Sequence, residues 1–233
     1  MPFELLAKSL PQQILAKHKN NPKQIEALVF GQAGFLDEQR EDWFQTELYQ
    51  EYNFLKKKYS LVSLDKSLWK FLRLRPNNFP TIRLAQFSAL VLKSNHLFSK
   101  VLDIDNIKDL SALFSDLPVN KYWETHYQFC RSAEKNSVKI GRESIVNILI
   151  NTVSVCIFVY GRFMGIEQFE KRALSFLESL PSETNQIIRR FVEIGIKTGG
   201  ADKSQSLLQL KKNYCDQKRC LNCSIGVKLL NQD

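Results

Sequence analysis

The sequence has 233 residues, of which 44% are hydrophobic and 24% charged, values that exclude a disordered or collagen-like chain. A chain of this length can bury one sizeable hydrophobic core, so we expect a single domain over residues 1–233. The formal net charge of +9 favours a polyanionic partner, although the cations are spread along the chain rather than gathered in one block. Phe is frequent (16) while Gly (9) and Pro (7) are scarce, a balance that favours helices over many short strands.

Helical patterns begin at the N-terminus. Residues 3–19 place leucines and isoleucines at helical spacing, and Pro11 divides them into two short helices. A further helix is expected over residues 22–35. Asp37 is the predicted N-cap of a long helix whose last turn carries three lysines at 56–58, where cations suit the negative pole of the helix.

The middle of the chain alternates between turns and shorter helices. Two prolines bracket a turn in RLRPNNFPTIR (73–83), and an apolar helix is expected from about residue 79 to 94. Residues 96–118 hold two shorter helical patterns. The segment 119–129 is rich in aromatic residues, and the polar segment 131–141 is the best candidate for an exposed loop.

Residues 142–160 form the most apolar segment, and we expect them to be the central, buried helix of the core. The longest apolar run, Ile145–Tyr160, is shorter than the ~20 residues that cross a bilayer, so no membrane span is predicted. Asn147 and Asn151 lie four residues apart within this helix, and we expect them to form hydrogen bonds with neighbouring backbone or side chains.

The C-terminal part of the chain continues as helices. An amphipathic helix over 166–180 stops at Pro181, another runs to about residue 194, and the last begins at Ser204 and leads into a cysteine-containing segment. The sequence contains no alternating strand pattern, internal repeat or low-complexity linker. The predicted fold class is therefore all-α, an irregular multi-helix bundle around the central helix 142–160, without a domain boundary.

Five strings stand out along the chain: RLRPNNFPTIRLAQ, YWETHYQF, GRESIVNILINTV, LESLPSETNQIIRR and SQSLLQLKKNYCDQKRCLNCSIG. Together they resemble a bacterial family of domains of unknown function, number 2851. The resemblance covers nearly the whole chain, from the first helices to Leu230. It implies a bacterial protein from a family without an assigned function, and no particular chemistry. It also implies that this chain corresponds to the C-terminal portion of longer members.

The cysteine segment, residues 214–226, contains Cys215, Cys220 and Cys223 in a chain that has five cysteines. A Cys-x2-Cys pair supplies two thiolates on one tight turn, and Cys215 lies close enough along the chain to add a third. Three interpretations stay open: a metal site, a redox-active or regulatory set of thiols, and cysteines with no role beyond packing. If a metal is present, the spacing does not distinguish zinc from an iron–sulfur cluster.

A metal site of this kind needs a fourth ligand from elsewhere in the chain. His126 and Cys130 are the leading candidates, because they would share one face if their segment were helical. Cys156, His96 and His18 are the other donors, and Cys156 is more simply explained as a small buried apolar residue of the central helix.

Arg73, Arg75 and Arg83 gather around the turn that precedes the apolar helix, and we identify them as candidate anion-binding residues. Asn78 is the expected cap of that helix, and Pro80 lies where a missing N–H does no harm. Arg83 lies in the first turn, where a cation opposes the helix dipole, so either a carboxylate pairs with it or an anion binds at the turn. A structural role for these arginines and a contact with phosphate or nucleic acid both stay open.

The remaining observations bear on location and function. Glu4 and Lys8 interrupt the N-terminus where a secretory signal would be apolar, and the odd number of cysteines fits a reducing compartment, so we expect a cytoplasmic protein. The sequence contains no phosphate-binding loop, nucleophile elbow or zinc-protease motif, and Glu124 with His126 is the weakest of the candidate sites. We therefore expect a metal-supported helical module that binds a polyanion, nucleic acid above all. The alternatives are a structural or protein-interaction domain and the helical half of a larger enzyme.

Overall fold

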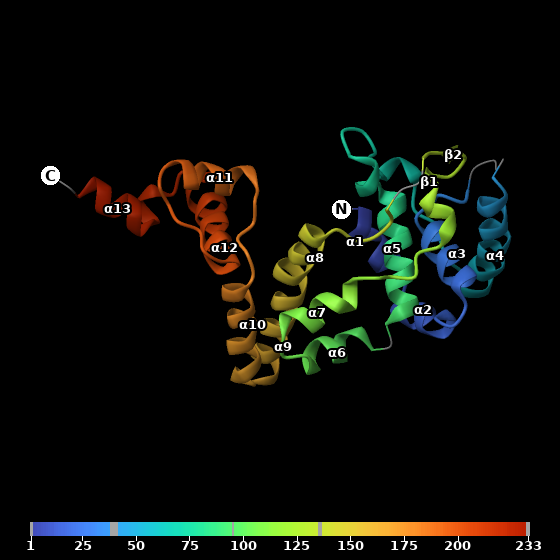
Figure 1. Ribbon diagram of the computed structural model, residues 1–233, viewed down its shortest axis with the longest axis horizontal. Coiled ribbons are helices and arrows are strands. Elements are labelled where there is room, and N and C mark those ends of the chain that lie inside the picture. Colours follow the sequence, from blue (N-terminus) through green and yellow to red (C-terminus); the bar gives the residue numbers. More distant parts are fainter. Residues whose placement is uncertain (1, 38–41, 95, 135–136, 232–233) are drawn as a thin grey trace. The chain divides into compact units, whose positions relative to one another are not determined.

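The computed structural model describes residues 2–37, 42–94, 96–134 and 137–231 (Figure 1). The chain divides into two compact units, each of which is described by itself. The first unit comprises Met1–Leu97 and Leu113–Ile140, and the second comprises Phe98–Ala112 and Gly141–Asp233. The expectation of a single domain was based on a sequence without a visible boundary, and it stays a prediction.

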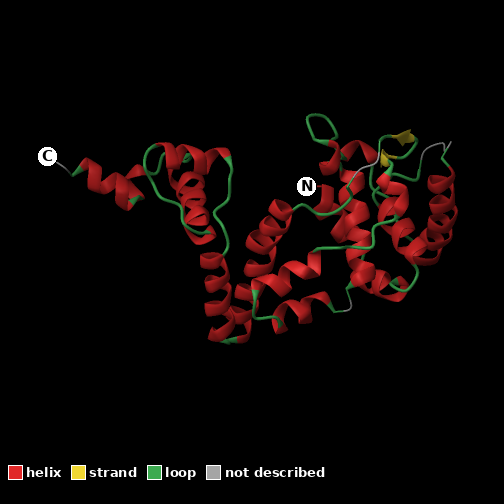
Figure 2. Cartoon of the chain, viewed as in Figure 1, coloured by secondary structure: helices red, strands yellow, loops and turns green. Residues whose placement is uncertain are grey.

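The predicted all-α class is confirmed (Figure 2). The α-helices of the N-terminal half are α1 (Pro2–Ser9), α2 (Gln12–His18), α3 (Pro22–Gln32), α4 (Trp43–Tyr59), α5 (Pro80–Lys93), α6 (Leu97–Asp103) and α7 (Ile107–Phe114). Those of the C-terminal half are α8 (Arg142–Ile148), α9 (Ser154–Met164), α10 (Glu167–Ser179), α11 (Gln186–Glu193), α12 (Ala201–Leu210) and α13 (Ser224–Leu230). Among the described residues, strands are confined to an antiparallel pair, β1 (His126–Gln128) and β2 (Arg131–Ser132).

Helix α3 is the centre of the first unit. Pro22 occupies its first turn, and the Asn21 side chain caps it by accepting a hydrogen bond from the Gln24 backbone N–H. Every residue from Ile25 to Gln32 is buried, and the largest hydrophobic cluster of the described residues forms around this helix. Each fully buried aliphatic or aromatic side chain contributes roughly 1.5–3 kcal/mol by its removal from water, so α3 is the main stabilising element of this unit.

A glycine in α3 allows α4 to approach closely. A Cβ atom on Gly31 would lie 2.1 Å from Cγ of Tyr52, so only glycine fits against this ring. The Tyr52 hydroxyl donates a hydrogen bond to Oε1 of Gln32 at 3.1 Å, and Nε2 of Gln32 donates to the carbonyl oxygen of Val62 at 2.6 Å. The two helices are therefore joined by ring packing and by a buried polar chain.

Helix α4 begins later than the sequence predicts. Its cap is Asp42, whose Oδ1 accepts from the backbone N–H groups of Phe44 (2.9 Å) and Gln45 (3.1 Å). The prediction of Asp37 as the cap is wrong, because that carboxylate instead accepts a hydrogen bond from the Ser63 hydroxyl. Either aspartate has the chemistry of a cap, and only the tertiary position separates them. The basic last turn of α4 is confirmed.

The predicted central helix is confirmed as a helix, whereas its burial differs from the prediction. Residues 142–164 form one continuous helix in which a π-helical turn, Leu149–Val153, joins α8 to α9. One face is buried, while Val155, Val159 and Phe163 on the outer face are 51%, 57% and 86% exposed. Cys156, expected to be buried, is also exposed. The sequence shows that a helix is apolar, but burial also requires partners on every side.

The length and composition of this helix bear on the question of a membrane. Residues Arg142–Met164 are long and apolar enough to span a bilayer, and one third of the most apolar window is buried in the protein (33%). This is weak support for a span, since the core helices of soluble proteins pass the same test.

The helix also packs tightly against α10, because a Cβ atom on Gly161 would lie 2.8 Å from Cβ of Phe169.

Candidate functional site

The basic loop, residues 70–78, is the candidate functional site. It lies in the first unit, between the 3-10 turn η1 (Lys66–Leu68) and α5, and its last residues form a second 3-10 turn, η2 (Pro76–Asn78). The loop contains two of the three arginines that the sequence identifies as candidate anion ligands. The third, Arg83, lies in the first turn of α5.

Aromatic packing anchors the base of the basic loop. The Trp69 indole N–H donates to the carbonyl oxygen of Ala33 at 2.8 Å, which ties the start of the loop to the buried core. The ring of Phe71 packs edge-on, with its centroid 6.2 Å from that of Phe35 and 5.1 Å from that of Phe79. Since the ring contacts involve both ends of the loop, its backbone is held before any ligand binds.

The turn into α5 follows from its two prolines. The Asn78 backbone N–H donates to the Arg75 carbonyl at 2.8 Å, and that of Phe79 donates to the Pro76 carbonyl at 2.9 Å. Pro80 is the first residue of α5, as predicted. The N-cap, however, is Phe79 and not Asn78, so the prediction of an asparagine cap is wrong.

Arg83 explains why Asn78 does not cap the helix. Its Nη2 donates to Oδ1 of Asn78 at 2.7 Å, and its Nη1 donates to Oε1 of Gln86 at 2.9 Å. Gln86 in turn donates to the Val138 carbonyl at 2.9 Å, which joins this cluster to the end of the first unit. Burial lowers the pKa of the Arg83 guanidinium. Arg83 therefore supports the loop from within, which leaves the exposed arginines of the loop as the candidates for ligand contact.

The tip of the basic loop is exposed. Lys70, Arg73 and Arg75 all lie in solvent, and none of them forms a salt bridge with a residue that the structure describes. Leu72 and Leu74 alternate with the arginines and are 84% and 43% exposed. Arg73 has a left-handed backbone (φ 64°), which is uncommon for a residue other than glycine. The tip thus presents cations and leucine side chains on one short, anchored segment.

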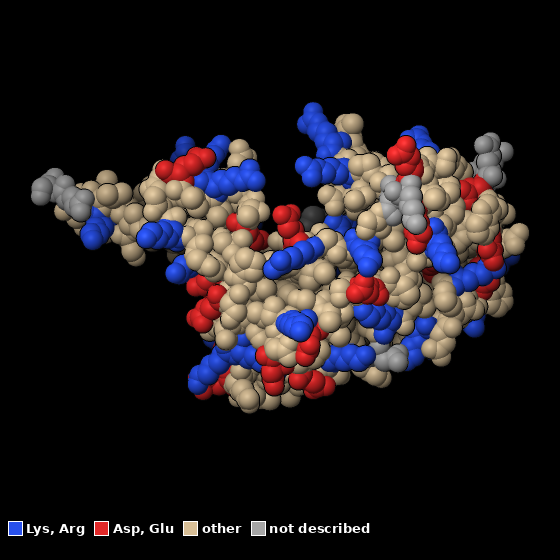
Figure 3. Space-filling view, in the orientation of Figure 1, with Lys and Arg blue, Asp and Glu red and all other residues tan. Residues whose placement is uncertain are grey.

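The charge around the basic loop is segregated, a signal that the sequence analysis missed. Between Asp65 and Asp103 the chain contains no carboxylate side chain. The cations within that stretch are Lys66, Lys70, Arg73, Arg75, Arg83, Lys93 and Lys100. On the face drawn in Figure 3, Lys and Arg side chains protrude at the loop that precedes α5 (upper centre), and no Asp or Glu is visible beside them. A count of net charge over the whole chain averages out this local excess.

The cysteine segment begins where a helix ends. The π-helical turn Lys211–Cys215 extends α12, and Lys218 then takes a left-handed conformation (φ 53°). The Arg219 backbone N–H donates to the Tyr214 carbonyl at 2.9 Å and that of Lys218 to the Cys215 carbonyl at 3.1 Å. These two bonds form a Schellman motif, which satisfies carbonyls at the helix end.

The Cys-x2-Cys pair does form a tight turn. Cys220–Asn222 is a 3-10 turn, and the Cys223 backbone N–H donates to the Cys220 carbonyl at 3.2 Å. Gly226 packs against this turn so closely that a Cβ atom would lie 2.3 Å from the Cys220 oxygen. The backbone between Cys220 and Cys223 therefore forms the tight turn that was expected of a Cys-x2-Cys pair.

Two of the three cysteines of the segment line different pockets. Cys215 lines a pocket of about 360 Å³ with Arg190 and Phe191, whereas Cys223 lines a different pocket of about 340 Å³ with Tyr214. Among the described residues, no group of three or more His, Cys, Asp or Glu side chains is placed to hold a metal ion. The metal site stays a prediction that is based on the spacing of the cysteines alone.

The candidates for a fourth ligand lie in a hairpin of the first unit. His126 is in β1 and Cys130 is at the turn that follows, so the shared helical face considered for them does not exist. The His126 ring stacks on that of Tyr122 at 4.0 Å, and Sγ of Cys130 donates to Oε1 of Gln45 at 3.6 Å. The cysteine segment belongs to the second unit, so their part in a metal site stays a prediction.

The aromatic segment around Tyr122 belongs to the core. Trp123 is fully buried and stacks on Phe30 with ring centroids 5.0 Å apart. Burial, followed by the hydrogen bond to Asp42, raises the pKa of the Tyr122 hydroxyl, which donates to that carboxylate. This environment supports a packing role for the segment, and it adds nothing to the acid–base pair of Glu124 and His126.

Glu26 is a titratable group that the sequence analysis missed. It lies in α3, is 4% exposed, and accepts a hydrogen bond from Nδ2 of Asn120 at 2.9 Å. Burial raises the pKa of its carboxyl to about 7. The signal in the sequence is a single carboxylate within the otherwise apolar run from Ile25 to Gly31.

A polar cluster in the second unit confirms the prediction for Asn151, while Asn147 takes part through its backbone carbonyl. The Asn151 side chain lies in the π-helical turn and donates to the Asn147 carbonyl at 3.2 Å and to Oε1 of Glu183 at 3.3 Å. Gln205 donates to both Asn151 (3.3 Å) and Glu183 (2.6 Å). Asn147 and Glu183 also line a polar pocket of about 550 Å³ with Arg142. π-Helical turns often occur at functional sites, and this one carries a residue of the polar cluster.

Comparison with known proteins gives a family and no activity. The model of a family described as protein of unknown function (DUF2851) matches residues 1–186 of the chain. No curated protein and no solved structure matches. The matched span contains the basic loop and ends before the cysteine segment, so it is shorter than the resemblance to Leu230 that the sequence strings suggest.

Proposed function

The chain belongs to the DUF2851 family, and we propose that it is a helical module whose basic loop binds a phosphate-bearing polymer, nucleic acid in the first place. One observation carries the proposal: Lys70, Arg73 and Arg75 are exposed on an anchored loop, without a carboxylate in the surrounding stretch of chain. Cations that lack a protein partner attract anions over a long range, and their release of counterions drives binding to phosphate backbones.

The rigidity of the basic loop adds to the argument. A loop that is anchored through Trp69, Phe71 and Phe79 loses less conformational entropy on binding than a free one. Arginine is suited to such a site, because its planar guanidinium donates two parallel hydrogen bonds to a phosphate. Leu72 and Leu74 offer apolar contacts to sugars or bases between those phosphate contacts. Access to nucleic acid is consistent with a cytoplasmic location, which we propose as well.

Fewer observations support the part of the proposal in which a metal stabilises the protein. In it, Cys215, Cys220 and Cys223 would hold zinc or an iron–sulfur cluster that stabilises the end of the second unit. The Cys-x2-Cys turn supports this idea, and the separate pockets of Cys215 and Cys223 speak against it. Polyanion binding by the first unit does not depend on it.

A protein-interaction domain is the second candidate function. It is favoured by the exposed apolar residues on the outer face of α9, of which Phe163 is 86% exposed. The exposed apolar residues at and around α13, such as Leu221 and Leu229, point in the same direction. Under this alternative the basic loop would be an ordinary solvated segment.

The test compares several polyanions. Fluorescently labelled single-stranded and duplex DNA and RNA are titrated with the whole chain, and anisotropy reports binding, with inorganic polyphosphate as an unlabelled competitor. We expect saturable binding of at least one nucleic acid. Competition by polyphosphate at equal phosphate concentration would indicate that only the charge is recognised. Absence of binding to all four nucleic acids at low salt would overturn the proposal and favour the protein-interaction domain.

A further inference from the structure

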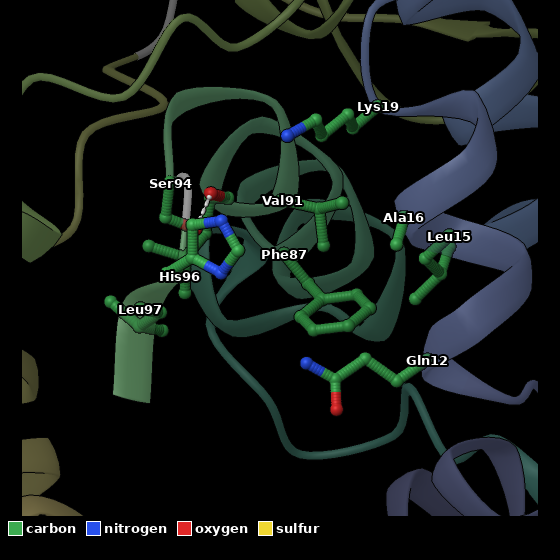
Figure 4. A pocket seen from close by; sticks show the side chains of 10 residues that line it. Gln12, Leu15, Ala16, Lys19, Phe87, Val91, Ser94, His96 and Leu97 are labelled. Carbon is green, nitrogen blue, oxygen red and sulfur yellow. Dashed lines mark hydrogen bonds between the residues drawn. The ribbon is translucent and has the colours of Figure 1, made fainter. Parts of the chain in front are cut away.

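A pocket of about 330 Å³ lies in the first unit between α2 and the last turns of α5 (Figure 4). Its walls are mainly apolar: Leu15 and Ala16 come from α2, and Phe87 and Val91 come from α5. The Phe87 ring faces the open space and is 40% exposed, so a ligand in the pocket would cover apolar surface that now contacts water.

The polar residues that line the pocket are Gln12, Lys19, Ser94 and His96, of which Lys19 is a cation. Lys19 and His96 line it, and Figure 4 shows the ammonium group of Lys19 extending toward the end of α5, where Ser94 and His96 lie. No Asp or Glu occurs among the described residues of the lining. A cation and an imidazole beside apolar walls complement a ligand that has an apolar body and one anionic end.

The backbone at His96 gives independent support. His96 has a left-handed conformation (φ 54°), which is uncommon for a residue with a side chain. Such strained positions occur preferentially at ligand-binding sites, where the surrounding structure fixes a side chain in place. Here His96 lies just after the end of α5 at Lys93, and its side chain lines the pocket.

We propose that this pocket binds a small apolar carboxylate, with an aromatic or branched body against Phe87 and Val91 and the carboxylate toward Lys19 and His96. The pocket volume of about 330 Å³ suits a molecule of on the order of ten non-hydrogen atoms, because one water molecule occupies roughly 30 Å³ in the liquid. The inference goes beyond the polyanion proposal and does not rest on it, since the pocket and the basic loop share no residue.

The probe for the test is para-trifluoromethylbenzoate, observed by fluorine NMR in the presence of the whole chain. Its uncharged amide is the matched control for the carboxylate. We expect Ala16→Trp, which fills the pocket, to abolish binding of both molecules. Lys19→Gln should weaken the benzoate about tenfold and leave the amide unchanged, which corresponds to the loss of one charge-assisted contact.

Lys17→Gln is the matched control variant, because Lys17 is exposed on the same helix and does not line the pocket. It should bind the benzoate as the wild type does. Three results would overturn the proposal: no binding at millimolar probe, unchanged binding by Ala16→Trp with a wild-type thermal transition, or equal losses in Lys17→Gln and Lys19→Gln. If Ala16→Trp unfolds, the comparison of the two lysine variants still decides the matter.

Discussion

Arg83 donates a hydrogen bond to Oδ1 of Asn78 at 2.7 Å, and this contact separates the arginines of the basic loop into two roles. The guanidinium of Arg83 is directed inward, to Asn78 and Gln86, while Arg73 and Arg75 are exposed at the tip. The sequence places all three in one motif. In the structure one of them holds the turn, and the other two are available to a ligand.

The first prediction follows from this division. Arg83→Ala should lower the free energy of unfolding by about 1–3 kcal/mol, because it removes the donor to Oε1 of the buried Gln86 and to Oδ1 of Asn78. Arg75→Ala should change it by less than about 0.5 kcal/mol, as is usual at an exposed position. Urea denaturation of both variants measures the difference. Equal effects would mean that Arg83 has no special structural role.

The second prediction concerns the contact of α3 with α4. Gly31→Ala should destabilise the chain by about 3 kcal/mol or more, because its Cβ atom would lie 2.1 Å from Cγ of Tyr52 in a close-packed core. Gly141→Ala is the control, since a Cβ atom there meets no atom within 4 Å. Thermal unfolding followed by circular dichroism gives both values. A Gly31→Ala variant as stable as Gly141→Ala would contradict the close approach of the two helices.

The third prediction concerns pH. Burial raises the pKa of Glu26 to about 7, so the folded chain holds this proton while the unfolded chain releases it near the ordinary pKa of a glutamate. Between these two values the folded state binds more protons, and its stability must fall as the pH rises. The contribution is fully present below the unfolded pKa and is lost as the pH passes through about 7. The loss is on the order of 3 kcal/mol.

Glu26→Gln isolates this contribution, because it keeps the shape and the acceptor for Asn120 without the charge. The variant should gain stability relative to the wild type as the pH increases from 5 to 8, as measured by urea denaturation at each pH. A constant difference across that range would show that the carboxylate is not desolvated in the folded protein.

The fourth prediction tests the cysteine segment. If the three cysteines hold a metal, the chain purified without oxygen should contain about one equivalent of zinc or an iron–sulfur chromophore. Cys220→Ser should lose it, and Cys156→Ser should retain it, because that exposed cysteine lies outside the segment. Elemental analysis and an absorption spectrum give the result. Metal-free protein in which all the thiols titrate with a disulfide reagent would exclude the site.

Features set by local chemistry could be predicted from the sequence. The helical class follows from apolar periodicity and scarce glycine, and Pro80 opens α5 because its fixed φ suits the first turn. Asn151 forms hydrogen bonds with the backbone one turn earlier and with Glu183. These properties depend on a residue and its near neighbours along the chain. The same holds for the turn between Cys220 and Cys223.

Features set by tertiary contacts could not be predicted. Asp37 and Asp42 have the same capping chemistry, and only the contact of Asp37 with Ser63 decides between them. The apolar helix 142–160 was expected to be the buried centre of the core, yet it keeps an exposed face, whereas α3 is buried from Ile25 to Gln32 within the first unit. The pocket at Phe87 is lined by residues of α2 and α5, which are far apart in sequence, so no local pattern reveals it.

The salt dependence of nucleic-acid binding tests the central claim most directly. A variant with Arg73→Asn and Arg75→Gln loses two cations at the tip, and Asn suits the left-handed backbone at 73. The matched control, Lys17→Gln with Lys57→Gln, loses the same charge from exposed helical positions of the first unit. Anisotropy titrations over a series of salt concentrations then compare the slope of log Kd against log salt.

We expect the double arginine variant to bind more weakly than the wild type and to reduce the magnitude of that slope by about 2, one for each lost phosphate contact. The lysine control should keep the wild-type slope. Equal slopes in the two double variants would contradict the account, because the basic loop would then contribute no more than any other part of a positively charged surface.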